Sequence, residues 1–273
     1  METTFASRTV LTTTPSERTL RPMGIGLSLV CFGIPGLLNV IGNHVATPAM
    51  VNIGLVPFYA QVIPSAVLLG LMLIASVWGY RLEGRVLDWQ GLTQRFRLHN
   101  LSRGDWLWAI GATIAGFIVY GWFTQIGHSL IQMGWMPLPD ALPAWLDPRV
   151  STPSVERFSV EAGGLRGNWL ALLAAITTFS LNIIGEEFWW RGYILPRQEL
   201  AFGKWTWLIH APLWSVFFHA FKWWDLVGMV PSNLIFVFAA YRTRNTTVAI
   251  VMHVATNIGF VAFVLLGVLE ITM

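Results

Sequence analysis

The chain has 273 residues, of which 55% are hydrophobic and 11% are charged, and its formal net charge is +3. Soluble globular domains carry about 25% charged residues, so this composition excludes an ordinary soluble fold. No run of Lys and Arg suggests a nucleic-acid partner, and a single cysteine, Cys31, excludes a disulfide framework and a cysteine metal cluster.

The first 23 residues differ from the rest of the chain. Residues 1–23 are polar, rich in Ser, Thr and Arg, and poor in acids. We expect a disordered cytosolic tail here, and the alternative is a transit peptide of similar composition. Residues 24–273 show no internal repeat and no low-complexity block, so we expect them to form a single membrane domain.

Seven apolar segments follow in chain order. A membrane-spanning helix needs about 20 apolar residues. On that basis the predicted spans lie near residues 24–42, 55–80, 106–127, 168–185, 205–221, 226–241 and 246–269. An eighth helix is compatible with the connections 128–167 and 192–203. The sequence therefore predicts an all-α, polytopic transmembrane bundle of seven to eight helices.

The positive charges alternate between the connections. With the N-terminus in the cytosol, the connections on that side hold 13 of the 17 Lys and Arg residues. The four remaining ones are Arg149, Arg157, Arg166 and Lys222. Cytosolic connections are enriched in Lys and Arg. We therefore expect an integral, multi-pass membrane protein with a cytosolic N-terminus and with membrane lipid as a partner.

Two adjacent carboxylates, Glu186 and Glu187, directly follow the apolar run that ends at Gly185. Ionisable residues at membrane depth are costly and indicate a functional site. On a helix, Glu187 and Arg191 share a face one turn apart and can form an ion pair. Glu186 points about 100° away and is left to meet another group. The alternative is a simple ion pair at a helix end.

Three histidines lie in the later apolar segments. His219 follows an aromatic run, and His253 precedes Asn257 by one helical turn, which places both on one face. Each of these groups can instead bridge helices by hydrogen bonding. His210 lies nine residues before His219, at another depth and on another face, so we interpret it as structural.

Taken together, these polar groups lie on three apolar segments, and they must converge because lipid offers no hydrogen-bond partner. A converged Glu and His can take a proton from water and make it a nucleophile. A converged His and Asn can donate hydrogen bonds to a developing oxyanion. Such a set is sufficient for amide hydrolysis without a covalent intermediate.

The motifs Glu186-Glu187-x-x-x-Arg191, His219 and His253-x-x-x-Asn257 resemble those of the CPBP family of intramembrane metalloproteases. This is the family of the CAAX-processing endopeptidase, also called the Abi family. The specific resemblance covers about residues 165–260, where we expect the catalytic core. One position departs from the family pattern, because Ser215 stands where Phe is usual four residues before the histidine.

The resemblance implies a role for each matched residue. Glu186 and His219 would activate water, and His253 and Asn257 would stabilise the oxyanion. Glu187 and Arg191 would support them. The implied activity is an intramembrane endopeptidase acting on a membrane-tethered or lipid-modified peptide. The best-known target of the family is a prenylated C-terminal motif.

The same residues leave the cofactor open between two alternatives. Glu186, His219 and His253 supply three ligands, which is the number found in catalytic zinc sites. However, the chain has no HExxH motif and no ligand pair at an established zinc spacing, so we favour a mechanism without zinc or another divalent metal.

Two other function classes compete with the endopeptidase. A non-catalytic relative would keep the fold as a membrane scaffold or immunity factor, but a substitution at Glu186 would then be expected. A transporter would more often show repeated halves, which this chain lacks.

Overall fold

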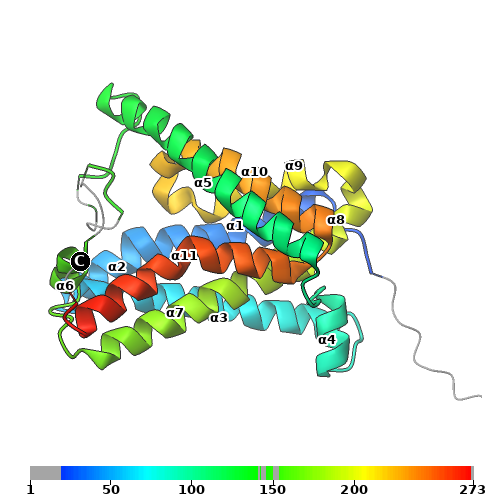
Figure 1. The fold of residues 1–273 in the computed structure, drawn as a ribbon, viewed down its shortest axis with the longest axis horizontal. Helices are drawn as coiled ribbons and strands as arrows, with labels where there is room; N and C mark the ends of the chain where they lie inside the picture. Colours follow the sequence, from blue (N-terminus) through cyan, green and yellow to red (C-terminus); the bar gives the residue numbers. More distant parts are fainter. Residues whose placement is uncertain (1–19, 141, 143–145, 150–153, 272–273) are drawn as a thin grey trace, which may run out of the picture.

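The computed structural model describes residues 20–140, 142, 146–149 and 154–271. All regular elements among these residues are helices, which confirms the predicted all-α fold (Figure 1). Most of the predicted N-terminal tail, residues 1–19, lies outside the described part. Met23, by contrast, is buried, and its backbone N–H donates to the carbonyl of Arg197 at 2.9 Å.

The elements follow one another along the chain with short connections. They are α1 (Ile25–Ile41), η1 (Gly42–Ala46), α2 (Thr47–Asn52), α3 (Pro57–Leu82), α4 (Trp89–Arg95), α5 (Arg103–Gln132), α6 (Val155–Glu161), α7 (Trp169–Glu187), η2 (Phe188–Ile194), α8 (Leu195–Phe202), η3 (Gly203–Trp205), α9 (Thr206–Leu213), η4 (Trp214–Phe218), η5 (Ala220–Asp225), α10 (Leu226–Thr243) and α11 (Thr246–Val268). Of these, η1, η2 and η4 are π-helical, whereas η3 and η5 are 3₁₀-helical.

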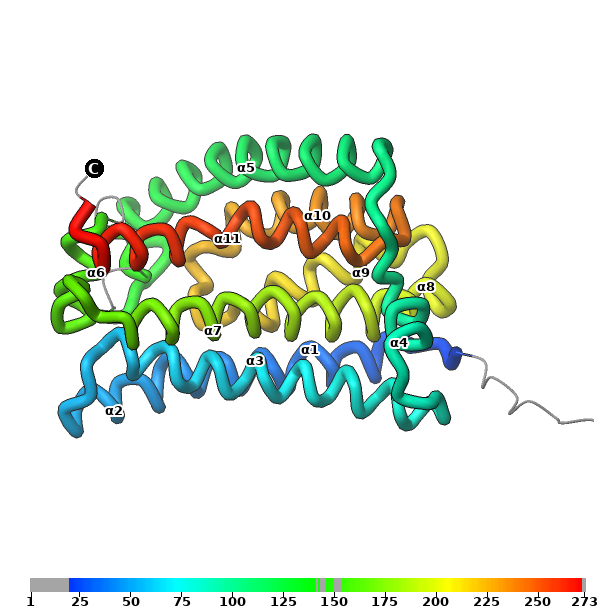
Figure 2. Tube along the Cα trace, turned by 60° about the horizontal axis from the view of Figure 1, so that its bottom comes forward, coloured from blue at the N-terminus to red at the C-terminus, as the bar shows by residue number. Residues whose placement is uncertain are grey.

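Six helical segments of the described chain are long and apolar enough to cross a membrane. The expectation of seven separate spans differs at one place. The predicted spans 168–185 and 205–221 belong to one continuous helical segment, Trp169–Phe218, whose path turns back at α8 (Figure 2). The chain is thus a multi-pass integral membrane protein. The start of α1 lies beside α8 and the end of α11 lies beside α6, at opposite ends of the bundle.

Helix α7 lies at the centre of the bundle, between α3 and α11 (Figure 2). Its first turn is capped by Asn168, whose side-chain oxygen accepts from the N–H of Ala171 at 3.0 Å. Gly185 permits close packing near the other end, because a Cβ atom there would lie 2.5 Å from the carbonyl oxygen of Leu69. The small residue at this position lets α7 place the following carboxylates against its neighbours.

Helix α1 packs closely against η4, the turn that precedes His219, and Gly36 lies at the contact. A Cβ atom on Gly36 would collide with the backbone carbonyl of Phe217, whereas one on Gly26 would meet no atom. We expect Gly36→Ala to lower the free energy of unfolding by about 1–3 kcal/mol through overpacking. Gly26→Ala, the same change on the same helix, is expected to be neutral or slightly stabilising because Ala favours helix.

Thermal unfolding of both variants in detergent measures this difference. Equal unfolding temperatures for Gly36→Ala and Gly26→Ala would contradict the close approach of α1 to η4.

Candidate active site

The two adjacent carboxylates lie inside a continuous helical path and not at a helix end. After Glu187 the backbone continues through the π-helical η2 into α8, which ends at Phe202. Glu186 and Glu187 are 2% and 1% exposed. The expectation that Glu186 lies at the end of its span is therefore wrong, and the extension brings it to the depth of His219. Single π-helical turns are frequent at functional sites.

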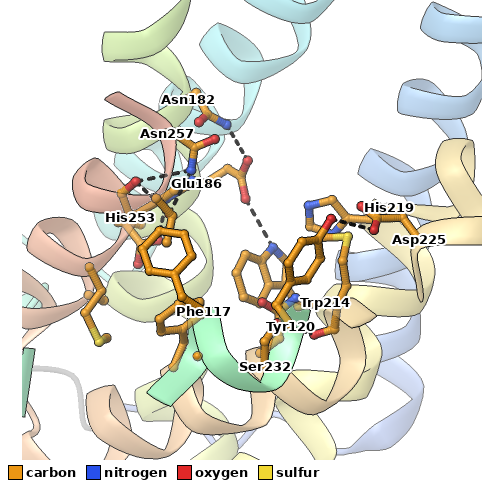
Figure 3. A pocket seen from close by; sticks show the side chains of 18 of the residues that line it. Phe117, Tyr120, Asn182, Glu186, Trp214, His219, Asp225, Ser232, His253 and Asn257 are labelled. Carbon is orange, nitrogen blue, oxygen red and sulfur yellow. Dashed lines mark hydrogen bonds and ion pairs between the residues drawn. The ribbon is translucent and has the colours of Figure 1, made fainter. Parts of the chain in front are cut away.

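Glu186 is held by three hydrogen-bond donors. One carboxylate oxygen accepts from the side-chain amide of Asn182 at 2.6 Å. The other accepts from the indole N–H groups of Trp190 at 3.2 Å and Trp214 at 3.1 Å, and Figure 3 shows the bonds of Asn182 and Trp214. Hydrogen bonds to the ionised form offset part of the cost of burying a carboxylate. The site therefore holds Glu186 ready to accept a further proton.

Glu187 forms the predicted ion pair with Arg191, with 3.2 Å between the carboxylate oxygen and the guanidinium nitrogen. The guanidinium carbon also lies 3.7 Å from the centre of the Trp214 ring. The same oxygen of Glu187 is 2.8 Å from Nδ1 of His253, a contact that the sequence did not predict. Glu187 therefore connects α7 with α11 and orients the His253 ring.

The contact with Glu187 determines which nitrogen of His253 is available. An ionised carboxylate can only accept a hydrogen bond, so Nδ1 of His253 carries the hydrogen and Nε2 is left for another partner. Neutral His253 offers a lone pair at Nε2, and protonated His253 offers an N–H. Donation to an oxyanion thus requires the protonated ring, whose charge the adjacent Glu187 would stabilise.

Asn257 lies one turn after His253, and both residues line the same cavity. Its amide nitrogen donates to the backbone carbonyl of His253 at 3.1 Å and to the hydroxyl of Thr256 at 3.0 Å. The amide hydrogens are therefore engaged within α11, and Asn257 must rotate about its side-chain bonds before it can donate to a substrate.

His219 lies where the helix breaks between η4 and η5, with φ −103° and ψ 16°. Its ring packs edge-on against Trp214 and Phe218, with ring centres 5.5 Å and 5.3 Å apart. Nδ1 of His219 is buried and has no hydrogen-bond partner among the described residues. A buried polar atom without a partner marks a position where a water or substrate group can bind.

The departure from the family pattern at Ser215 has a local explanation. The hydroxyl of Ser215 donates to the carbonyl of Ala211 at 2.8 Å and accepts from the amide of Asn233 at 2.9 Å. The serine thus ties η4 to α10. His210 lies elsewhere, where Nδ1 contacts the side-chain oxygen of Gln198 at 2.6 Å.

One cavity of about 280 Å³ unites the candidate residues (Figure 3). It is lined by all six residues singled out from the sequence: Glu186, Glu187, Arg191, His219, His253 and Asn257. Sequence reasoning missed several others, namely Tyr120, Asn182, Trp214, Lys222 and Asp225. A signal was present for Asn182, which lies one helical turn before Glu186.

Tyr120, Lys222 and Asp225 form a polar group at the wall of this cavity. The hydroxyl of Tyr120 donates to Asp225 at 2.7 Å, and the Lys222 ammonium lies 2.9 Å from the other carboxylate oxygen. Asp225 falls between two predicted apolar segments, so its place beside the candidate site could not be read from the spacing of the motifs.

The alternative zinc site does not fit the arrangement of its three proposed ligands. No group of three His, Cys, Asp or Glu side chains in the described part of the chain is placed to hold a metal ion. Glu186 already accepts three hydrogen bonds, and His253 directs Nδ1 to Glu187. A catalytic zinc site requires three protein ligands around one point, and these residues do not provide them.

Comparison with known proteins agrees with the location of this site. Residues 168–259 match the family described as type II CAAX prenyl endopeptidase Rce1-like. This segment belongs to the CAAX-protease family. The Rce1-like segment begins at the cap of α7 and ends two residues after Asn257, so it contains all six residues singled out from the sequence. Searches of curated proteins and of solved structures each found no match.

Proposed function

We propose that the chain is an intramembrane endopeptidase that hydrolyses a peptide bond of a membrane-tethered or lipid-modified peptide. The observation that carries the proposal is a single cavity, inside the Rce1-like segment, lined by Glu186, His219, His253 and Asn257. A membrane interior offers few reasons to gather these groups, because each is costly there without a function.

In the proposed reaction, Glu186 and His219 bind the attacking water between them. Glu186 takes a proton from this water while the water oxygen attacks the carbonyl carbon of the peptide bond. The three donors to Glu186 hold its carboxylate in one orientation during this transfer. Glu186 then returns the proton to the departing amine nitrogen as the carbon–nitrogen bond breaks.

The negative charge that develops on the carbonyl oxygen needs donors placed in advance. Protonated His253 would donate from Nε2, and Asn257 would donate its amide after leaving Thr256. Such donors are typically worth about 3–4 kcal/mol of transition-state stabilisation each. Glu187 and Arg191 act on this step by positioning His253 and balancing its charge.

A substrate comparison tests the proposal. Wild-type protein in lipid vesicles is given two peptides of identical sequence, one prenylated at its C-terminal motif and one without the lipid. We expect cleavage of both peptides, with a lower KM for the lipid-bearing one because it concentrates in the bilayer. Failure to cleave either peptide, or any other membrane-anchored peptide, would favour the non-catalytic scaffold.

We also propose that no metal ion takes part. We expect a strong chelator to leave the rate of peptide cleavage within about twofold of the untreated rate, because the donors that stabilise charge are side chains already present in the cavity. Initial rates before and after chelation, followed by addition of zinc, measure this. A large loss that zinc restores would overturn the metal-free mechanism.

The orientation proposed for the chain places the N-terminus in the cytosol. Several basic residues lie at the same end of the bundle as the start of α1, where Arg95 donates to the carbonyl of Gly192 and Arg97 pairs with Glu199. Enrichment of Lys and Arg favours the cytosolic side. Arg8 and Arg18, which also entered this prediction, lie outside the described residues.

A further inference from the structure

A second cavity of about 260 Å³ meets the first at the candidate catalytic residues. Both cavities are lined by Asn182, Glu186, His219, Lys222 and Asn257. The second one extends away from them between α1, α3 and α7. Its polar lining comes largely from segments that precede the Rce1-like part of the chain, namely Asn39, Asn43, Gln61 and Ser65.

These polar side chains form a connected series of hydrogen bonds. The amide nitrogen of Gln61 donates to the side-chain oxygen of Asn43 at 2.8 Å, and Asn43 in turn donates to the side-chain oxygen of Asn39 at 3.0 Å. Asn39 then donates to the carbonyl of Phe218, directly before His219, at 2.9 Å. A polar path therefore joins α3 to the candidate site.

Two hydroxyl groups on opposite walls point to bound water. The hydroxyl of Thr178 on α7 is buried and has no hydrogen-bond partner among the described residues. Ser65 on α3 donates to the carbonyl of Gln61 at 2.9 Å and keeps acceptor capacity toward the cavity. A polar cavity holds a water once it offers about 10–15 Å³ and two to four polar partners. This cavity meets both conditions several times over.

The two cavities differ in the character of their walls. Phe117, Met229, Phe236 and Met252 line the first cavity and suit the side chains of a peptide. The second cavity also has apolar residues, Leu68, Leu69, Phe179, Phe218, Phe221 and Phe260, but these surround a series of amides and hydroxyls. A peptide that fills the first cavity would displace water from it, whereas the second would remain hydrated.

We propose that the second cavity is a water reservoir that supplies the attacking water to Glu186 from the α1–α3 side while the substrate occupies the first cavity. The inference rests on the proposed function for the use of this water, but the hydration of the cavity is independent of any activity. Each turnover consumes one water and adds it to the products, so a site surrounded by lipid needs such a supply.

Cysteine labelling tests the hydration directly. Cys31, the single cysteine, is replaced by Ala, and either Ser65→Cys or Val67→Cys is then introduced. Val67 lies on the same helix at nearly the same depth, but it is 58% exposed on the outer face of the bundle, where lipid or detergent covers it. A charged, water-soluble thiol reagent reacts with the thiolate, which a hydrated site permits and an apolar one suppresses.

We expect Ser65→Cys to react at least about tenfold faster than Val67→Cys, since the thiolate needs water. Thr178→Cys, on the opposite wall, is expected to behave like Ser65→Cys and replaces it if that variant does not fold. Equal or slower labelling at both cavity positions would overturn the proposal, and this result does not depend on whether the protein cleaves peptides.

Kinetics then test what the reservoir does. Gln61→Met keeps the size of the side chain and removes its hydrogen bonds, and Gln61→Glu keeps a hydrated polar group. We expect Gln61→Met to lower kcat by about five- to tenfold with KM nearly unchanged, corresponding to the loss of about one ordered hydrogen bond. Gln61→Glu is expected to retain more of kcat. An unchanged kcat in Gln61→Met, with labelling as expected, would show a hydrated cavity that does not supply the reaction.

Discussion

We expect Glu186→Gln to lower the rate of peptide hydrolysis by about 10²–10⁴-fold, the usual contribution of a positioned general base. A neutral amide has no acceptor basic enough to take a proton from water. The amide can nevertheless keep the local packing, because its oxygen can accept from Trp190 and Trp214 while its nitrogen faces Asn182. The loss should therefore appear in kcat and leave the unfolding temperature nearly unchanged.

Glu156→Gln provides the matched control for this substitution. Glu156 lies in the short α6, is exposed and does not line the candidate site. Its variant is expected to cleave peptide at the wild-type rate. Initial rates of both purified variants in the same vesicles make the comparison, and equal rates for Glu186→Gln and Glu156→Gln would remove Glu186 from the mechanism.

The second large effect is expected on stability. Arg191→Met leaves the carboxylate of Glu187 buried with His253 as its remaining contact. Removal of one partner from a buried ion pair costs about 3–5 kcal/mol, because the other charge stays desolvated and uncompensated. We expect a correspondingly large fall in the unfolding temperature in detergent, accompanied by loss of activity through misplacement of His253.

A double variant separates the ion pair from general packing damage. Glu187→Gln combined with Arg191→Met removes both charges and should be more stable than Arg191→Met alone. Arg166→Met serves as the exposed control, since the pair of Arg166 with Glu270 is largely solvent-exposed and should be worth at most about 1 kcal/mol. If the double variant is less stable than Arg191→Met, the explanation by an uncompensated charge is wrong.

Much of the fold could be predicted because lipid imposes simple rules on sequence. Long apolar segments indicated the spanning helices, and spacing on a helix placed Glu187 with Arg191 and His253 beside Asn257. The turn within Trp169–Phe218 could not be predicted in this way. Hydropathy does not distinguish a helix that continues from one that bends, and π-helical turns depend on tertiary contacts more than on composition.

The details of the site were less accessible to sequence reasoning. The donors that hold Glu186 include Trp190 and Trp214, which in a membrane protein are expected at the interface because of their amphipathic rings. The contact of Glu187 with His253 joins residues 66 positions apart. Asn39, Asn43 and Gln61 lie in segments that match the Rce1-like family in no motif, so nothing in their spacing pointed to the second cavity.

The central claim is that this chain adds water to a peptide bond at Glu186, and mass spectrometry of the products tests it most directly. A membrane-anchored peptide is incubated with wild-type protein or with Glu186→Gln in ¹⁸O-labelled water. We predict two fragments from the wild-type reaction, with the label in the new carboxyl group, and intact peptide from the variant. Intact peptide in both reactions, or identical labelled fragments in both, would contradict the account.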